Sequence, residues 1–75
     1  MSIFWHTERP AGFADGKFLY YREGTCHEDD VKPTGADAAD LAEASMLVES
    51  SGLVSFYNRE DDKWDPMFSV KEAAL

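Results

Sequence analysis

The segment TGADAADLAEASMLVESSG, Thr34–Gly52, decides the predicted fold, because its apolar residues recur with the period of a helix. At 100° per residue, an apolar stripe runs along one side of a helix over Ala36–Ser50. The stripe consists of Ala38, Leu41, Ala42, Ser45 and Val48, with Met46 at its edge. Thr34 and Asp37 have the spacing of a capping box, and Gly52 suits the left-handed residue that closes a helix. We therefore expect one helix whose stripe covers a sheet.

Two short segments before this helix predict a pair of strands. Ile3–Thr7 is aromatic and β-branched and has the alternation of a half-buried strand. Lys17–Glu23 alternates in the same way, and Asp15-Gly16 supplies the positive backbone angles of a tight hairpin turn. Phe13 leaves the returning strand short, so a wider loop between the two strands stays open as an alternative. Either connection gives two antiparallel strands.

The segments after the helix predict a second pair of strands. Leu53–Asn58 resumes the two-residue period, and a charged turn, Arg59–Lys63, follows it. Trp64–Phe68 contains a proline, which cannot donate in a central ladder, and this favours an edge strand. Ser69 either caps a short last turn through Ala73 or belongs to a frayed end.

The resulting fold class is α+β, with the order ββαββ and one helix packed on a small antiparallel sheet. Gly24–Gly35 is a polar and charged connection between the first strand pair and the helix. At this length, residues 1–75 form a single small acidic domain.

Composition indicates a folded protein with an acidic surface. The formal net charge is -8 at pH 7, while 44% of the 75 residues are hydrophobic and 13% are aromatic. A disordered acidic tail would lack these aromatics, because it cannot bury enough apolar area to offset the entropy of ordering. The negative field favours a basic protein partner and disfavours direct binding to DNA, RNA or an anionic membrane. Such a small domain also has little room for a closed catalytic pocket, so we expect a binding protein and no enzyme.

We predict no catalytic residue, no metal site and no cofactor. Cys26 and His27 are adjacent and point apart on an extended loop, and the chain has one Cys and two His without the spacing of a zinc site. One Cys also excludes an intramolecular disulfide. The N-terminal residues lack the pattern of a secretory signal, and no apolar stretch is long enough to cross a membrane. We therefore expect a cytoplasmic protein.

Acidic residues form three clusters, and these are the candidate partner-binding sites. On the predicted helix, Asp37, Asp40 and Glu43 make a solvent-facing ridge without Lys or Arg, and Leu47 lies near it as an exposed contact. The other two clusters are in predicted loops. The complete candidate set is Glu28, Asp29, Asp30, Asp37, Asp40, Glu43, Leu47, Glu60, Asp61, Asp62 and Asp65.

A rigid array of carboxylates can occupy the Lys and Arg sites that hold backbone phosphates, since arginine pairs with both groups in the same bidentate geometry. We therefore predict a non-enzymatic acidic inhibitor that occupies the nucleic-acid-binding site of a larger complex of the host-defence or transcription type. A phage or mobile-element nucleic-acid mimic of the anti-CRISPR type would act in this way.

Two alternatives stay open. The acidic residues can serve solubility alone. The protein can also be a small adaptor or a homodimer that uses an exposed aromatic patch or a sheet edge, with no relation to nucleic acid. The candidate aromatics are Trp5, Tyr20, Tyr21, Tyr57 and Trp64. The predicted oligomeric state is therefore a monomer or a homodimer.

Overall fold

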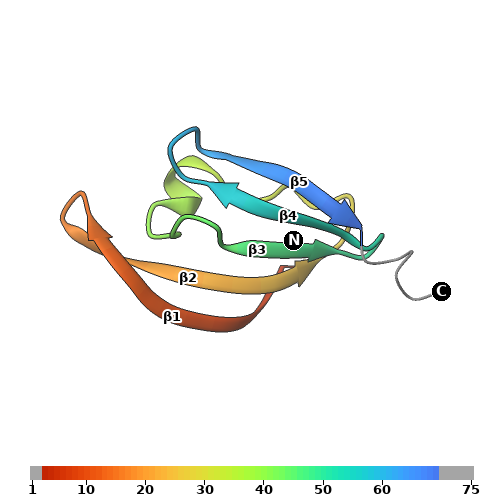
Figure 1. The fold of residues 1–75 in the computed structure, drawn as a ribbon, viewed down its shortest axis with the longest axis horizontal. Coiled ribbons are helices and arrows are strands. Elements are labelled where there is room, and N and C mark those ends of the chain that lie inside the picture. Colours follow the sequence, from red (N-terminus) through yellow and green to blue (C-terminus); the bar gives the residue numbers. More distant parts are fainter. Residues whose placement is uncertain (1–2, 70–75) are drawn as a thin grey trace.

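The computed structural model describes residues 3–69, which form one five-stranded mixed sheet (Figure 1). The strands are β1 (Phe4–Ala14), β2 (Lys17–Cys26), β3 (Met46–Glu49), β4 (Leu53–Asn58) and β5 (Lys63–Ser69). Their order in the sheet is β1-β2-β3-β4-β5. Neighbouring strands are antiparallel except for β2 and β3, which are parallel and are joined by a crossover segment, residues 27–45. The longest helical element in residues 3–69 is a four-residue 3-10 turn, η1 (Gly35–Ala38).

The predicted helix over Ala36–Ser50 is wrong, and so is the α+β class with the order ββαββ. After η1 the chain turns, Ala44 takes a left-handed φ of 69°, and the next residues form β3 in the middle of the sheet. Backbone pairing with a distant strand replaces the helical bonds: the amide of Ala42 donates to the carbonyl of Tyr20 at 2.9 Å. Tertiary pairing thus overrides the local preference for a helix.

The two motifs that marked the ends of the predicted helix belong to turns instead. The Thr34 side chain makes no capping hydrogen bond, although the amide of Asp37 donates to the Thr34 carbonyl at 3.2 Å. Gly52 has a φ of 96°, and its amide donates to the carbonyl of Glu49 at 2.8 Å. This glycine closes the turn between β3 and β4, so its left-handed conformation was predicted for the wrong element.

The first hairpin is confirmed and is longer than predicted. Asp15 and Gly16 have φ values of 54° and 80°, which are the positive angles of a tight turn. The alternative of a wider loop is therefore wrong. β1 continues through Pro10 to the turn, with two bulges on the way, and β2 extends to Cys26. The predicted connection from Gly24 consequently begins later than expected.

The second hairpin is also confirmed. β4 has the predicted bounds, and β5 lies at the edge of the sheet, as Pro66 indicated. The predicted turn after Ser69 lies outside the described residues. Among residues 3–69, the structure contains no helix long and apolar enough to cross a membrane.

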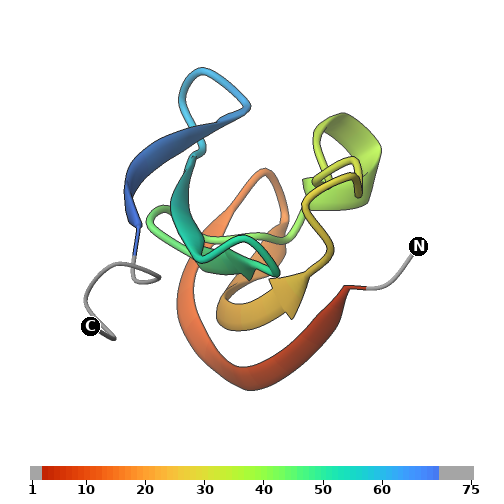
Figure 2. The same ribbon diagram turned by 90° about the vertical axis from the view of Figure 1, so that its right-hand side faces the viewer.

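One face of the sheet packs against the crossover segment and holds the core (Figure 2). The core cluster consists of Ala38, Leu41 and Tyr57, with Trp5 and Trp64 packed against it. A row on the same face passes through Trp5, Gly24, Leu47 and Ser55 on four successive strands. Leu47 has no exposed area, so the expectation of an exposed contact there is wrong.

The opposite face, which we call the open face, carries a largely apolar row across all five strands. Strand register places Phe4, Thr25, Val48, Val54 and Phe68 side by side. The two ends of the row are exposed, at 62% for Phe4 and 52% for Phe68, whereas Val54 in its centre is buried.

Candidate interaction site

Two acidic segments that are far apart in the sequence meet at one end of the sheet. The Asp62 carboxylate accepts hydrogen bonds from the Gly35 amide, at 2.9 Å, and from the Tyr57 hydroxyl, at 2.7 Å. The Glu43 carboxylate accepts one from the Arg59 amide at 2.8 Å. These bonds attach the β4–β5 turn to the crossover segment. The exposed acids that they bring together, Asp37, Glu43, Glu60, Asp61 and Asp62, are called the acidic surface below.

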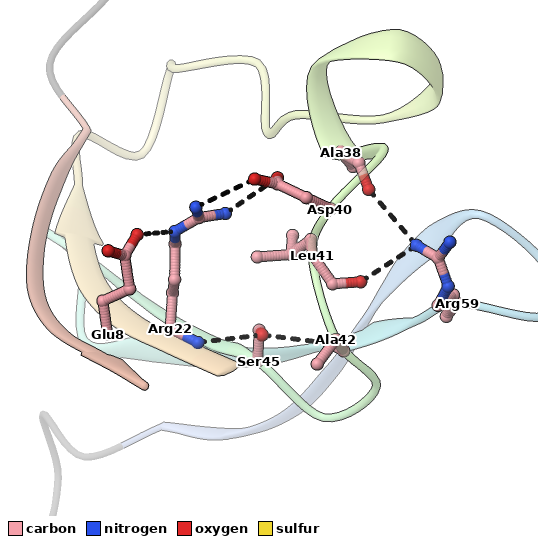
Figure 3. Close-up of polar contacts among 8 residues, drawn as sticks. All are labelled: Glu8, Arg22, Ala38, Asp40, Leu41, Ala42, Ser45 and Arg59. Atoms are coloured by element: carbon pink, nitrogen blue, oxygen red, sulfur yellow. Dashed lines mark hydrogen bonds and ion pairs between the residues drawn. The ribbon is translucent and has the colours of Figure 1, made fainter. Parts of the chain in front are cut away.

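The arginine nearest to this surface points inward. Arg59 Nη1 donates to the carbonyls of Ala38, at 3.4 Å, and Leu41, at 3.1 Å (Figure 3). Its Nη2 lies 3.7 Å from a carboxylate oxygen of Asp15. Within residues 3–69, no Lys or Arg forms an ion pair with any of the five acids of the acidic surface. The Asp62 and Glu43 carboxylates accept hydrogen bonds from within the protein, and all five acids are exposed and carry their charge without a Lys or Arg in ion-pair contact.

Asp40 has a structural role and does not join the acidic surface. Both oxygens of its carboxylate accept from the Arg22 guanidinium, at 3.0 and 3.2 Å, and Arg22 Nε donates to Glu8 at 2.6 Å (Figure 3). The hydrogen bonds from Arg22 lower the pKa of Asp40, and those to Asp40 raise the pKa of Arg22. The predicted ridge of three solvent-facing acids is thus absent, because these residues are not on a helix and one of them holds β2 to the crossover segment.

Ser45 also holds β2 to the crossover segment, through the backbone of Arg22. Its hydroxyl accepts from the Arg22 amide at 3.1 Å and donates to the Ala42 carbonyl at 2.9 Å (Figure 3). Ser45 is fully buried, although it is polar and does not lie on a helix stripe as predicted. A short polar side chain here ties the two ends of the turn before β3 to β2.

The remaining candidates lie elsewhere. The Glu28 amide donates to the Ser50 hydroxyl beside the β3–β4 turn, so Glu28, Asp29 and Asp30 are at the opposite end of β4 from the acidic surface. A strand of six residues separates these ends by roughly 20 Å. Asp65 on β5 lies beside the acidic surface, because Asn58 Nδ2 donates to both Asp61 and Asp65 at 3.4 Å, but Lys63 Nζ is 3.6 Å from the Asp65 carboxylate. The acidic surface therefore holds five of the eleven candidates, Asp65 lies next to it in an ion pair with Lys63, and the other five do not join it.

Burial and hydrogen bonding shift the pKa values of Tyr57 and Asp62, the two residues whose contact anchors the acidic surface. Burial and the hydrogen bond to Asp62 raise the pKa of Tyr57 to about 12. The hydrogen bonds from Tyr57 and from the Gly35 amide lower the pKa of Asp62. The phenol is therefore protonated and the carboxylate ionised at neutral pH, as their hydrogen bond requires.

This titration gives a prediction for acid stability. The lowered pKa of Asp62 contributes stability above the unfolded value of about 3.9, and this contribution is lost as the pH falls through the folded value. Asp62→Asn should therefore melt at a lower temperature than the wild type at pH 7, and this difference should shrink by pH 3. Thermal unfolding at pH 7, 5 and 3 checks it. Asp61→Asn, one residue away, is the matched control and should follow the wild-type profile.

Sequence reasoning missed Arg22 and Arg59, and it named Tyr57 only as a candidate aromatic of an interaction patch, whereas the structure buries Tyr57 and bonds its hydroxyl to Asp62. Arg22 and Asp40 are 18 positions apart, and Tyr57 and Asp62 are in contact because of the hairpin turn. The charged turn after β4 was the available signal for the second contact, whereas nothing local indicated the first. Residues 3–69 contain no group of three or more His, Cys, Asp or Glu side chains arranged to hold a metal ion. Cys26 is buried, and its burial raises the pKa of the thiol.

Comparisons of this chain with protein-family models, with curated proteins and with solved structures gave no match. The functional conclusion therefore comes from the site itself.

Proposed function

We propose that the protein is a non-enzymatic binding protein that presents its acidic surface to the basic, nucleic-acid-binding site of a larger protein. The observation that supports this most strongly is the attachment of the β4–β5 turn to the crossover segment through Asp62 and Glu43. This attachment gathers exposed carboxylates on ordered backbone, where they can meet arginine and lysine side chains without a large ordering cost.

The distribution of cations supports the same function. Arg22 and Lys32 form ion pairs with Asp40 and Glu49 away from the acidic surface, and Lys63, which is adjacent to this surface, pairs with Asp65. The five acids of the acidic surface themselves form no ion pair with Lys or Arg among residues 3–69, whereas a surface selected for solubility alone interleaves the two signs. Such a field speeds association with a basic partner and excludes competitors of the same sign.

The test begins with capture of a partner from an extract of the source organism, followed by affinity measurements on the purified partner. Glu60→Lys with Asp61→Lys should weaken binding by at least about tenfold, because two carboxylates become cations facing a basic site. Wild-type binding should weaken steeply with salt, and duplex DNA or RNA should displace the protein.

The matched control reverses two charges at the other end of the molecule. Glu28→Lys with Asp29→Lys changes the net charge equally and should keep most of the affinity. Equal losses in the two variants would assign binding to net charge and not to this surface. Unchanged binding in the first variant would reject the proposal.

The open face supports a second candidate, an adaptor or homodimer, because Phe4 and Phe68 are exposed at the two ends of one row. The same assay separates the candidates. For an interaction through the open face, Phe68→Ser would abolish binding, the Glu60 and Asp61 reversal would not, and salt would have little effect.

A further inference from the structure

A pocket lies between the start of β1 and the crossover segment, next to the acidic surface. Ile3 and Trp5 line one side, residues 31–34 line the other, and Asp37 stands at the rim. Its volume is about 380 Å³, at the small end for ligand sites, which fits one or two side chains of a protein partner. The lining is mainly apolar, so the pocket offers an aromatic wall with a carboxylate beside it.

Hydrogen bonds and an ion pair hold the wall of the pocket in place. The Trp64 indole Nε1 donates to the Pro33 carbonyl at 2.8 Å, which fixes the crossover segment over the core. Lys32 Nζ lies 2.5 Å from a Glu49 carboxylate oxygen, and both side chains are largely buried. The one cation in the lining is therefore already paired, while Asp37 is exposed and forms no ion pair among residues 3–69.

The pocket adjoins a strand edge. β1 is the first strand of the sheet and hydrogen-bonds β2 alone among the described strands. An edge strand presents a row of backbone N–H and C=O groups to which an extended segment can pair. Side chains of such a segment alternate between the two faces, so every second one lies on the face where Ile3 and Trp5 line the pocket.

We propose that this pocket binds an arginine side chain from an extended segment of the partner protein, with the segment paired to the edge of β1. The methylene stem of the arginine packs against Ile3 and Pro33, and its guanidinium stacks on Trp5 and pairs with Asp37. Charge complementarity selects this occupant, because the free charge at the pocket is negative and its wall is aromatic. The inference rests on the proposed function for the basic character of the partner and adds the chemistry of the segment.

The test uses NMR on the whole protein with a defined probe, the peptide acetyl-Val-Arg-Val-Arg-Val-amide. Saturable shifts are expected for the Trp5 indole N–H and for the amides of the first half of β1, with little change at Trp64. The same peptide with citrulline in place of arginine keeps the shape and removes the charge, and it should bind at least about tenfold more weakly. Asp37→Asn should weaken the arginine peptide about fivefold, with the affinity read from the same titration.

The controls separate this inference from the proposed function. In the Glu60→Lys with Asp61→Lys variant the peptide should bind more weakly, because the added cations repel it, but it should still shift the Trp5 indole N–H and still lose about fivefold in affinity on Asp37→Asn. Val31→Ser, at the exposed rim, should weaken binding and keep the fold.

Equal binding of the citrulline peptide would make the pocket an apolar site and overturn the inference. If the NMR signals of the pocket residues shifted with protein concentration in the absence of peptide, the occupant of the pocket would be a second copy of the chain, and the inference would be overturned. No Trp5 shift at millimolar peptide would also overturn it, whatever the acidic surface binds.

Discussion

Gly24→Ala is expected to destabilise the protein by at least about 2 kcal/mol, a large share of the 5–15 kcal/mol typical of a folded domain. Gly24 is buried on β2 under the Trp5 side chain. A β-carbon there would lie 2.4 Å from the Phe4 carbonyl oxygen and 2.8 Å from Trp5 Cε3. The first contact is with backbone, so relief requires the start of β1 to move away from β2. Urea unfolding followed by tryptophan fluorescence measures the loss.

Thr25→Ala is the matched control for this substitution. Thr25 is the next residue on β2, faces the open side and is exposed, so its replacement should change the free energy of unfolding by less than about 0.5 kcal/mol. If both variants unfolded at the wild-type urea concentration, the close approach of β1 to Gly24 would not exist in solution. Loss of stability in Gly24→Ala should also abolish peptide binding at the pocket, because Trp5 is displaced.

Leu47→Ala is expected to cost about 2–5 kcal/mol, because it removes a fully buried side chain and leaves a cavity between β2 and β4. In the α+β prediction the same residue was exposed on a helix, where this substitution would have almost no effect. Chemical unfolding of the variant therefore distinguishes the two folds directly.

Met67→Ala provides the comparison for Leu47→Ala. Met67 is 60% exposed beside the bulge in β5, and its truncation should stay within about 0.5 kcal/mol of the wild type. Comparable losses in the two variants would contradict the placement of β3 in the centre of the sheet.

The strands with clear alternation and clear turn residues could be predicted from the sequence. Asp15-Gly16 identified the first hairpin, and Leu53–Asn58 was predicted at its observed bounds. The failure at Ala36–Ser50 has a physical cause. Ala38, Leu41 and Ala42 have helical spacing, but in the structure they belong to the crossover segment, whose backbone pairs with β2, and they are buried there without a helix. β3 is also only four residues long, and its sequence Met-Leu-Val-Glu lacks the polar and apolar alternation that indicates a strand.

The acids of the candidate site could be found from composition, but their arrangement could not. The contact between Asp62 and the Gly35 amide spans 27 positions, and it determines which acidic segments meet. Asp40 was indistinguishable from Asp37 in the sequence, yet Arg22 binds the first and leaves the second exposed. Pairing of this kind depends on the sheet register, which the sequence did not specify.

The parallel pairing of β2 with β3 has a consequence for how the chain reaches its native state. The β1–β2, β3–β4 and β4–β5 hairpins join neighbours in sequence and can form within microseconds, whereas β3 can align with β2 only after residues 27–45 have looped over the sheet. We therefore expect the pairing of β2 with β3 to be the slow step of folding. Until these two strands pair, β2 and β3 each expose an unpaired edge that a second nascent chain can fill, so the crossover that joins them also protects the protein from aggregation.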